Sequence, residues 1–381
     1  MIPFASLFLV LIFSLFGGPD KEKDHQEFQV SSGQRLLINI ESGGAISVSG
    51  WDKEVVSLDV DRRGRDDDEC TVEAQRTGSG VEISSRYEGY RHSSRTELKF
   101  IVHVPKSFDL DVETTGGAIS IDNVSGKIEG RTMGGALDFT QLKGTLHFET
   151  MGGKISLTKS EVDGEVSTNG GSVLLEDVVG NVKGHSMGGK VIYRNVTDRK
   201  GLSTGNAVVI STMGGEVNVD DAPYGADLNT MGGEIDVKSA SQFVKAKTMG
   251  GDITIGSVDG WVDAETMGGD VTVTMVGDPS KGRRDVRISS KGGDVTLTVP
   301  SGLSMDVDIT ISRTREWHRR SDERVPKIES DFSLKQEESK DWDDREGSAR
   351  KYLRGRGTIG DGANKIRIET VNGSVYLRKS S

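Results

Sequence analysis

The chain carries a pattern of alternating apolar and polar residues that restarts after each pair of adjacent glycines. Counted from the second glycine of a pair, the second and fourth residues are apolar, as at Ile119 and Ile121. An apolar residue at every other position is typical of a β-strand with one buried face. A second alternating stretch, such as the one containing Leu146 and Phe148, precedes the next pair. Each unit therefore predicts two or three short strands and no helix.

The glycine pairs recur at a nearly constant spacing. The step from one second glycine to the next is 18 residues, except for 26 between Gly189 and Gly215 and 24 between Gly269 and Gly293. A unit of this length buries its apolar face only if it forms a coil that pairs in parallel with the next coil, about 4.8 Å away. The sequence therefore predicts an all-β, single-chain β-solenoid. It has about ten regular Gly-Gly coils, and less regular β segments cap both ends.

This pattern divides the chain into four segments. Residues 1–18 are predicted to be a signal peptide or an N-terminal anchor, and residues 19–112 an N-terminal β region that leads into the solenoid. Residues 113–300 form the regular coils, and residues 301–381 a C-terminal β cap. Within that cap, residues 313–350 hold 10 basic and 11 acidic residues, so we expect a charged loop there.

The glycine pairs are the predicted corners of the coils, because two residues without a Cβ permit a tight turn with positive φ. The corner residues are Gly116, Gly117, Gly134, Gly135, Gly152, Gly153, Gly170, Gly171, Gly188, Gly189, Gly214, Gly215, Gly232, Gly233, Gly250, Gly251, Gly268, Gly269, Gly292 and Gly293. Methionine precedes seven of these pairs, and threonine usually precedes the methionine. We expect the methionines to fill irregular space at the corner and the threonine hydroxyls to hydrogen-bond along the stack. The alternative is an exposed methionine stripe that serves as an adaptable contact surface.

Carboxylates follow the last five glycine pairs directly. They are Glu216, Glu234, Asp252, Asp270 and Asp294. Coils in register would align them in one row, where neighbouring like charges are unfavourable. These five residues are therefore weak candidates for a divalent-cation site, although one carboxylate per coil supplies few of the ligands that calcium requires. The alternative is a solvated acidic face.

The first residues of the chain indicate export. No charged residue occurs from Ile2 to Gly18, and a charged run follows Pro19. This pattern predicts a location outside the cytoplasm, in the periplasm, at the cell surface or in the medium, with membrane contact only through an uncleaved N-terminal segment. A net charge of −11 disfavours nucleic acid as a partner, and the single cysteine, Cys70, cannot form a disulfide within the chain. No pattern predicts a cofactor.

Catalytic patterns are absent from the sequence. The six histidines are scattered, and neither a nucleophile elbow, a zinc-protease motif nor a phosphate-binding loop occurs. We therefore predict no catalytic residue and no enzyme. The alternative function is a carbohydrate-active enzyme, a polysaccharide lyase or hydrolase, whose paired carboxylates would be carried by a β-helix scaffold.

Several stretches together resemble a known bacterial family. They are the early run Ser42–Val48, the Pro-ended strand at Val102–Pro105, the Gly-Gly coils and the closing run Ile366–Val375. In this order they are similar to the domain of unknown function DUF4097, a candidate adhesin domain, over residues 28–378. The resemblance implies an exported or envelope-associated β-solenoid that binds an unidentified envelope polymer or surface protein. It carries over no catalytic residues.

Overall fold

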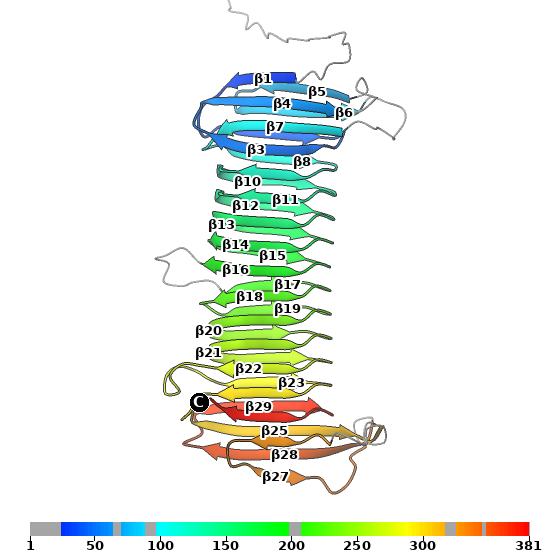
Figure 1. Ribbon diagram of the computed structural model, residues 1–381, viewed down its shortest axis with the longest axis vertical. Helices are drawn as coiled ribbons and strands as arrows, with labels where there is room; N and C mark the ends of the chain where they lie inside the picture. Colours follow the sequence, from blue (N-terminus) through cyan, green and yellow to red (C-terminus); the bar gives the residue numbers. More distant parts are fainter. Residues whose placement is uncertain are drawn as a thin grey trace, which may run out of the picture.

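The protein is an elongated stack of β-strands. The computed structural model describes residues 24–63, 70–87, 97–197, 207–316, 325–344 and 348–380, and its elements within them are the strands β1 to β30. Figure 1 shows the strands lying across a single long axis, from β1 at one end to β27 at the other. The predicted β-solenoid is confirmed.

Each regular coil contributes one strand to each of two stacks of parallel strands, and the core lies between the stacks. The strands of the first stack, each ending before a glycine pair or its equivalent, are β8 (Asp109–Thr114), β10 (Ser125–Thr132), β12 (Lys143–Thr150), β15 (Val182–Ser186), β17 (Val208–Ser211), β19 (Ala226–Asn229), β23 (Val286–Ser290) and β29 (Asn364–Val371). The strands of the second stack are β9 (Ile119–Asp122), β11 (Leu137–Thr140), β14 (Val173–Val179), β16 (Val191–Thr197), β18 (Val217–Ala222), β22 (Val271–Met275), β24 (Val295–Val299) and β30 (Val375–Lys379). Three longer strands run through both stacks: β13 (Ile155–Thr168), β20 (Ile235–Lys247) and β21 (Ile253–Thr266).

Neighbouring coils pair in register, so that equivalent residues lie above one another. Leu137 pairs with Ile155, and Ile128 with Leu146, each 18 positions further along. The long step between Gly189 and Gly215 leaves the stacking intact, because Tyr193 pairs with Val219. Apolar side chains therefore form continuous columns inside the stack, and each coil buries its apolar face only against its neighbours.

The glycine corners are tight for a different reason from the one predicted. Of the ten second glycines, only Gly117 has a left-handed φ, 111°. A Cβ built on any of the ten would lie 1.7–2.2 Å from the carbonyl oxygen of the equivalent glycine in the preceding coil. A Cβ on the first glycine of each pair from Gly116 to Gly292 meets no atom closer than 3.5 Å. The second glycine is thus required by the contact between coils, and the prediction of positive φ was wrong for nine of the ten.

Left-handed backbone occurs instead at the opposite corner of the coil, at glycines such as Gly126, Gly144 and Gly180 and also at residues other than glycine. Five of these other residues recur every 18 positions: Asn123, Gln141, Lys159, Asp177 and Asn195, with φ between 48° and 57°. Asparagine and aspartate tolerate this conformation better than most residues. Some neighbours are also linked, as Asn195 donates a hydrogen bond from Nδ2 to Oδ1 of Asp177 at 2.7 Å.

The N-terminal end is closed by strands that leave the coil pattern. The first coil consists of β2 (Arg35–Ile40) and β3 (Ala45–Trp51), and it is covered by β4 (Val55–Arg63), β6 (Gly80–Tyr87) and β7 (Glu97–Pro105). Two further strands pair antiparallel at this end, β1 (Asp24–Gln29) with β4 and β5 (Cys70–Arg76) with β6. These strands extend the backbone hydrogen bonding of the stack, and their exposed side chains include charged residues. Charged side chains on an edge strand discourage pairing with a strand of another chain. The predicted signal peptide or anchor at residues 1–18 lies outside the described residues.

The C-terminal end has a similar arrangement. After β24 the chain forms β25 (Met305–Thr314), which pairs antiparallel with β28 (Arg350–Ile359). It then returns, and β29 inserts between β23 and β25. The predicted charged loop at 313–350 is wrong in part, because β26 (Ile328–Ser330) and β27 (Lys335–Glu338) lie within it. β27 pairs with β28 through its backbone while its charged side chains point to solvent, so high charge does not prevent an edge strand here.

Replacing the second glycine of a pair by alanine should be much more damaging than replacing the first. We expect Gly233→Ala to lower the free energy of unfolding by about 3 kcal/mol or more, because its Cβ would lie 2.0 Å from the carbonyl oxygen of Gly215. Gly232→Ala is the matched control, since its nearest neighbour would be 3.8 Å away. Urea unfolding of both variants measures the difference, and equal losses would contradict this account of the corner.

Candidate functional site

The glycine corner is held by a column of buried hydroxyl groups at the end of the first stack. Thr248 is representative: its hydroxyl donates a hydrogen bond to the carbonyl oxygen of Gly233 in the preceding coil at 2.9 Å and accepts one from the N–H of Gly251 in its own coil at 3.2 Å. The same pair of bonds recurs at Thr132, Thr150, Thr168, Ser186, Thr212, Thr230, Thr266 and Ser290. The predicted hydroxyl column exists, but it bonds to backbone glycines rather than from one hydroxyl to the next.

The residue after each hydroxyl points outward, since side chains alternate along a strand. At seven coils this residue is methionine, and its exposed fraction lies between 45% and 58%. The seven are Met133, Met151, Met187, Met213, Met231, Met249 and Met267, and we call them the Met column. The expectation that they fill space inside the corner was wrong, because the buried hydroxyls and the glycine backbone already occupy it. The exposed stripe that we considered as the alternative is what the structure contains.

Successive members of the Met column are joined by hydrogen bonds between their backbones. The backbone N–H of Met213 donates to the carbonyl oxygen of Met187, that of Met231 to Met213 and that of Met249 to Met231, each at 3.1 Å. From Met187 to Met267 the column runs through consecutive coils without interruption. Asn169 interrupts it between Met151 and Met187, and Lys291 and Thr115 occupy the same position at its two ends.

The five predicted cation ligands lie beside the Met column, one residue beyond each glycine pair. The structure aligns Glu216, Glu234, Asp252, Asp270 and Asp294 along the stack, and the first four are exposed. The carboxylates of the three aspartates accept the backbone N–H of the next coil at 2.7 Å, that of Asp270, Asp294 and Ser374 in turn. These three carboxylates therefore help to hold neighbouring coils together. Among the described residues, no group of three or more His, Cys, Asp and Glu side chains is arranged to hold a metal ion.

A groove lies beside the first two members of the Met column. It has a volume of about 630 Å³, and Met133 and Met151 line it together with Glu41, Glu113 and Glu149. The one basic side chain in its wall, Arg131, is paired with Glu113 at 3.2 Å. The groove therefore combines two thioethers with an excess of negative charge.

Comparison with known proteins agrees with this architecture. The sequence profile of the family described as Toastrack DUF4097 matches residues 25–331. The chain belongs to the Toastrack DUF4097 family. No curated protein matches it.

Several solved structures are similar to this Toastrack chain at low identity. A putative adhesin from Parabacteroides distasonis is 12% identical, over 73% of this chain and 97% of that one, with a TM-score of 0.37. A putative adhesin from Bacteroides fragilis is 14% identical, over 74% and 98%, with a TM-score of 0.28. A putative lipid binding protein from Parabacteroides distasonis is also 14% identical, over 72% and 96%, with a TM-score of 0.28.

Two of the tryptophans in the described part of the Toastrack chain contact other side chains of the protein. The Trp261 ring stacks on Phe243 with centroids 4.9 Å apart, and the Arg283 guanidinium lies 5.1 Å from the Trp261 centroid. Trp51 is placed similarly between His103, at 5.0 Å, and the Lys53 ammonium, at 4.5 Å. Each of these two indoles therefore already has one ring stacked on it and one cation close to its centroid.

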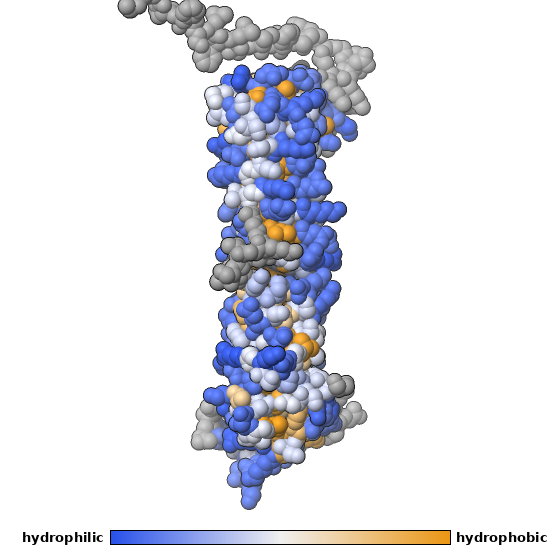
Figure 2. Space-filling model, turned by 90° about the vertical axis from the view of Figure 1, so that its left-hand side faces the viewer, coloured by the Kyte–Doolittle hydropathy of each residue, from blue (hydrophilic) through white to orange (hydrophobic). Residues whose placement is uncertain are grey.

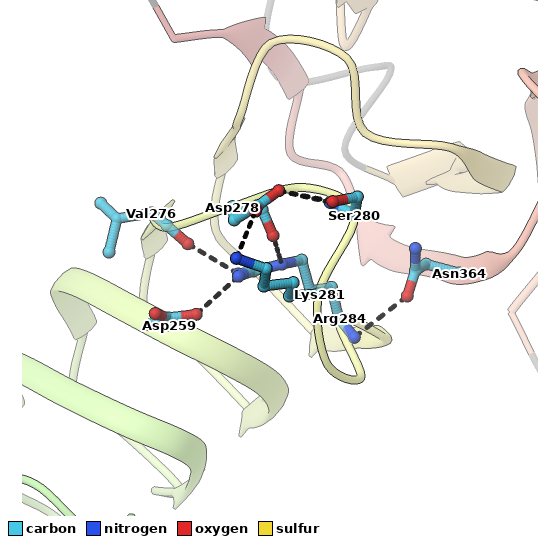
Figure 3. Close-up of polar contacts among 7 residues, drawn as sticks. All are labelled: Asp259, Val276, Asp278, Ser280, Lys281, Arg284 and Asn364. Carbon is cyan, nitrogen blue, oxygen red and sulfur yellow. Dashed lines mark hydrogen bonds and ion pairs between the residues drawn. The ribbon is translucent and has the colours of Figure 1, made fainter.

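A buried arginine, which we did not anticipate from the sequence, anchors the insertion between β22 and β23. Arg284 is 2% exposed, and its guanidinium contacts Oδ1 of Asp259 at 2.6 Å and the carbonyl oxygens of Val276 and Asp278 at 2.6 and 3.1 Å (Figure 3). The hydroxyl and N–H of Ser280 donate to the Asp278 carboxyl and lower its pKa. Each guanidinium nitrogen has a partner, so this cluster fixes a loop and is not a ligand site.

The edge opposite the Met column has a different character. Figure 2 faces the side on which β16 ends, and its surface is largely hydrophilic with separate hydrophobic spots. Two exposed apolar residues lie near that edge: Val209, close to the start of β17, and Val276, directly after β22. They belong to coils that are far apart along the stack. Among the described residues, the aligned row of exposed apolar side chains therefore lies at the glycine corner.

Removing one hydroxyl from the column should destabilise the protein. We expect Thr248→Val to cost about 2–4 kcal/mol, because it leaves the buried N–H of Gly251 and the carbonyl oxygen of Gly233 without their partner. Thr248→Ser should recover most of the loss, as Ser186 and Ser290 fill this role in other coils. Thr254→Val, at an exposed position, is the control and should change stability by less than about 0.5 kcal/mol. Thermal unfolding of the three variants gives the comparison.

Arg284→Met should also weaken the fold. We expect a loss of about 3 kcal/mol, because two carbonyl oxygens and Asp259 lose the buried guanidinium that donates to them. Lys281→Met is the control: its side chain is 80% exposed and its ion pair with Asp278 should contribute less than about 1 kcal/mol. Limited proteolysis of the loop together with unfolding curves would detect the change, and an unaffected Arg284→Met variant would contradict the anchoring role.

Proposed function

We propose that this Toastrack chain is an exported, non-enzymatic binding or scaffold protein of the cell envelope. Its Met column forms the contact surface for an envelope polymer or a surface protein. The observation that carries the proposal is the exposure of the column. Ten large hydrophobic side chains of the described residues are exposed, and seven of them belong to it.

An aligned row of exposed apolar side chains is unusual on a protein that has no partner there. Methionine is suited to binding, because its unbranched side chain adapts to irregular surfaces. The backbone beneath is rigid, since every coil is hydrogen-bonded to two others through strands and through the hydroxyl column. A partner therefore meets a preorganised row and loses little affinity to ordering of the backbone.

Export is supported by the charge-free apolar run from Ile2 to Gly18, which lies before the described residues. Among the described residues, no helix is long and apolar enough to cross a membrane. An extended solenoid of this kind suits a location outside the cytoplasm, where it presents a long surface to envelope material.

The enzymatic alternative finds no support in the described part of the chain. A glycosidase needs one carboxyl group with a raised pKa as its general acid. Each carboxyl group there with a shifted pKa is shifted downward, as at Glu265, which accepts a hydrogen bond from the Lys247 ammonium at 3.0 Å. We therefore favour a binding protein over a polysaccharide hydrolase, the class of enzyme that needs such a general acid.

Co-sedimentation with isolated cell-wall and membrane fractions of the source organism tests the proposal. We expect saturable binding that weakens at least tenfold when Met213, Met231 and Met249 are replaced by serine, since each loses a contacting apolar side chain of roughly 1 kcal/mol. The control replaces Asn218, Asp236 and Thr254 by serine; these residues lie on the outward face of the second stack in the same region. No binding to either fraction, or equal weakening by both triple variants, would refute the proposal.

A further inference from the structure

We propose that the Met column also binds a soft monovalent metal ion, Cu(I) or its closed-shell analogue Ag(I), between thioether sulfurs of successive coils. This inference rests on the proposed function in one respect only, namely that the Met column is the binding surface. It names a ligand class that an apolar contact surface alone would not select.

The choice of residue in the Met column points to sulfur chemistry. An apolar contact could be made by leucine, isoleucine or valine, which the chain uses throughout its core. Seven of its ten methionines occupy the column instead, and among the described methionines only Met275 and Met305 are buried in the core. Methionine differs from these residues in its polarizable thioether, which is a preferred ligand of Cu(I).

The spacing of the coils suits a shared metal ion. The backbones of Met187, Met213, Met231 and Met249 are hydrogen-bonded neighbours, so their side chains start about 4.8 Å apart. With a bond of the length that zinc makes to sulfur, about 2.3 Å, two sulfurs on opposite sides of one ion would lie about 4.6 Å apart. The flexible methionine side chains can absorb the small difference between this separation of the sulfurs and the spacing of the coils. Each adjacent pair can therefore hold one ion without movement of the backbone.

The charges around the Met column favour a cation. Glu216, Glu234, Asp252 and Asp270 follow Met213, Met231, Met249 and Met267 by three residues and are exposed. Of these four, Glu216 is paired with Lys190 at 2.6 Å. The groove at Met133 and Met151 adds Glu41 and Glu149 beside a second thioether pair, while its Glu113 is paired with Arg131. Aligned carboxylates raise the local concentration of cations, and the sulfurs select a soft one.

The carboxylates alone do not explain the arrangement. A calcium site needs several oxygens that converge from a loop, whereas these coils offer one carboxylate each. One oxygen of Asp252 and one of Asp270 already accept a backbone N–H. The row is therefore better suited to attracting an ion than to enclosing it, and the thioethers are the ligands.

Nuclear magnetic resonance of protein labelled with ¹³C at the methionine methyl groups tests this inference. Silver nitrate is added to the purified protein in a chloride-free buffer. We expect the methyl signals of the Met column to shift on saturation while those of the buried Met275 and Met305 stay unchanged. Replacing Met213, Met231 and Met249 by leucine should remove their shifts and lower the amount of silver bound. Met275→Leu is the control and should bind as much silver as the parent protein.

The outcomes separate this inference from the proposed function. Unmoved column signals, or equal silver uptake by the triple leucine variant, would overturn the inference. Leucine keeps the apolar surface, so the triple leucine variant should still sediment with envelope fractions if the proposed function holds. Silver-dependent shifts in a protein that binds no envelope fraction would support the metal site and refute the polymer or protein partner.

Discussion

The structure depends on the contact between the second glycine of one coil and the carbonyl oxygen of the same glycine in the preceding coil. This contact brings the two backbones so close that no Cβ fits between them. One buried hydroxyl per coil then joins the neighbours, donating across the interface and accepting from its own coil, as Thr248 does. A bond of this kind contributes about 1 kcal/mol. Because a solenoid is held together by the interfaces between neighbouring coils, the same bond repeated in every coil contributes a large part of the stability.

The same corner creates the exposed surface. Because side chains alternate along a strand, a hydroxyl that points inward forces the next residue outward just before the turn. The strict register then places these outward residues in one line. The Met column is thus a consequence of how the coils are joined, and its chemical character is set separately by the choice of methionine. The stacking of the coils and the proposed binding therefore depend on neighbouring residues of one four-residue motif.

The irregular parts of the chain protect this array. At both ends the chain leaves the coil pattern, forms antiparallel strands and returns, so that β8 and β29 each lie between a regular coil and a terminal one. The insertion before β23 is fixed by the buried Arg284. The strands at the two ends discourage pairing with another chain, and the Met column at the glycine corner stays exposed.

The sequence by itself determined the coil, its 18-residue period, the inward columns and the position of the corners, because these follow from alternation and from glycine spacing, which are local. It also allowed the family resemblance to be recognised. Only the tertiary structure decided why the second glycine is indispensable, since that depends on an atom 18 residues away. It likewise decided that the methionines are exposed and that strands occur within residues 313–350. Exposure and edge pairing depend on what already fills the neighbouring space, and a one-dimensional pattern does not contain that information.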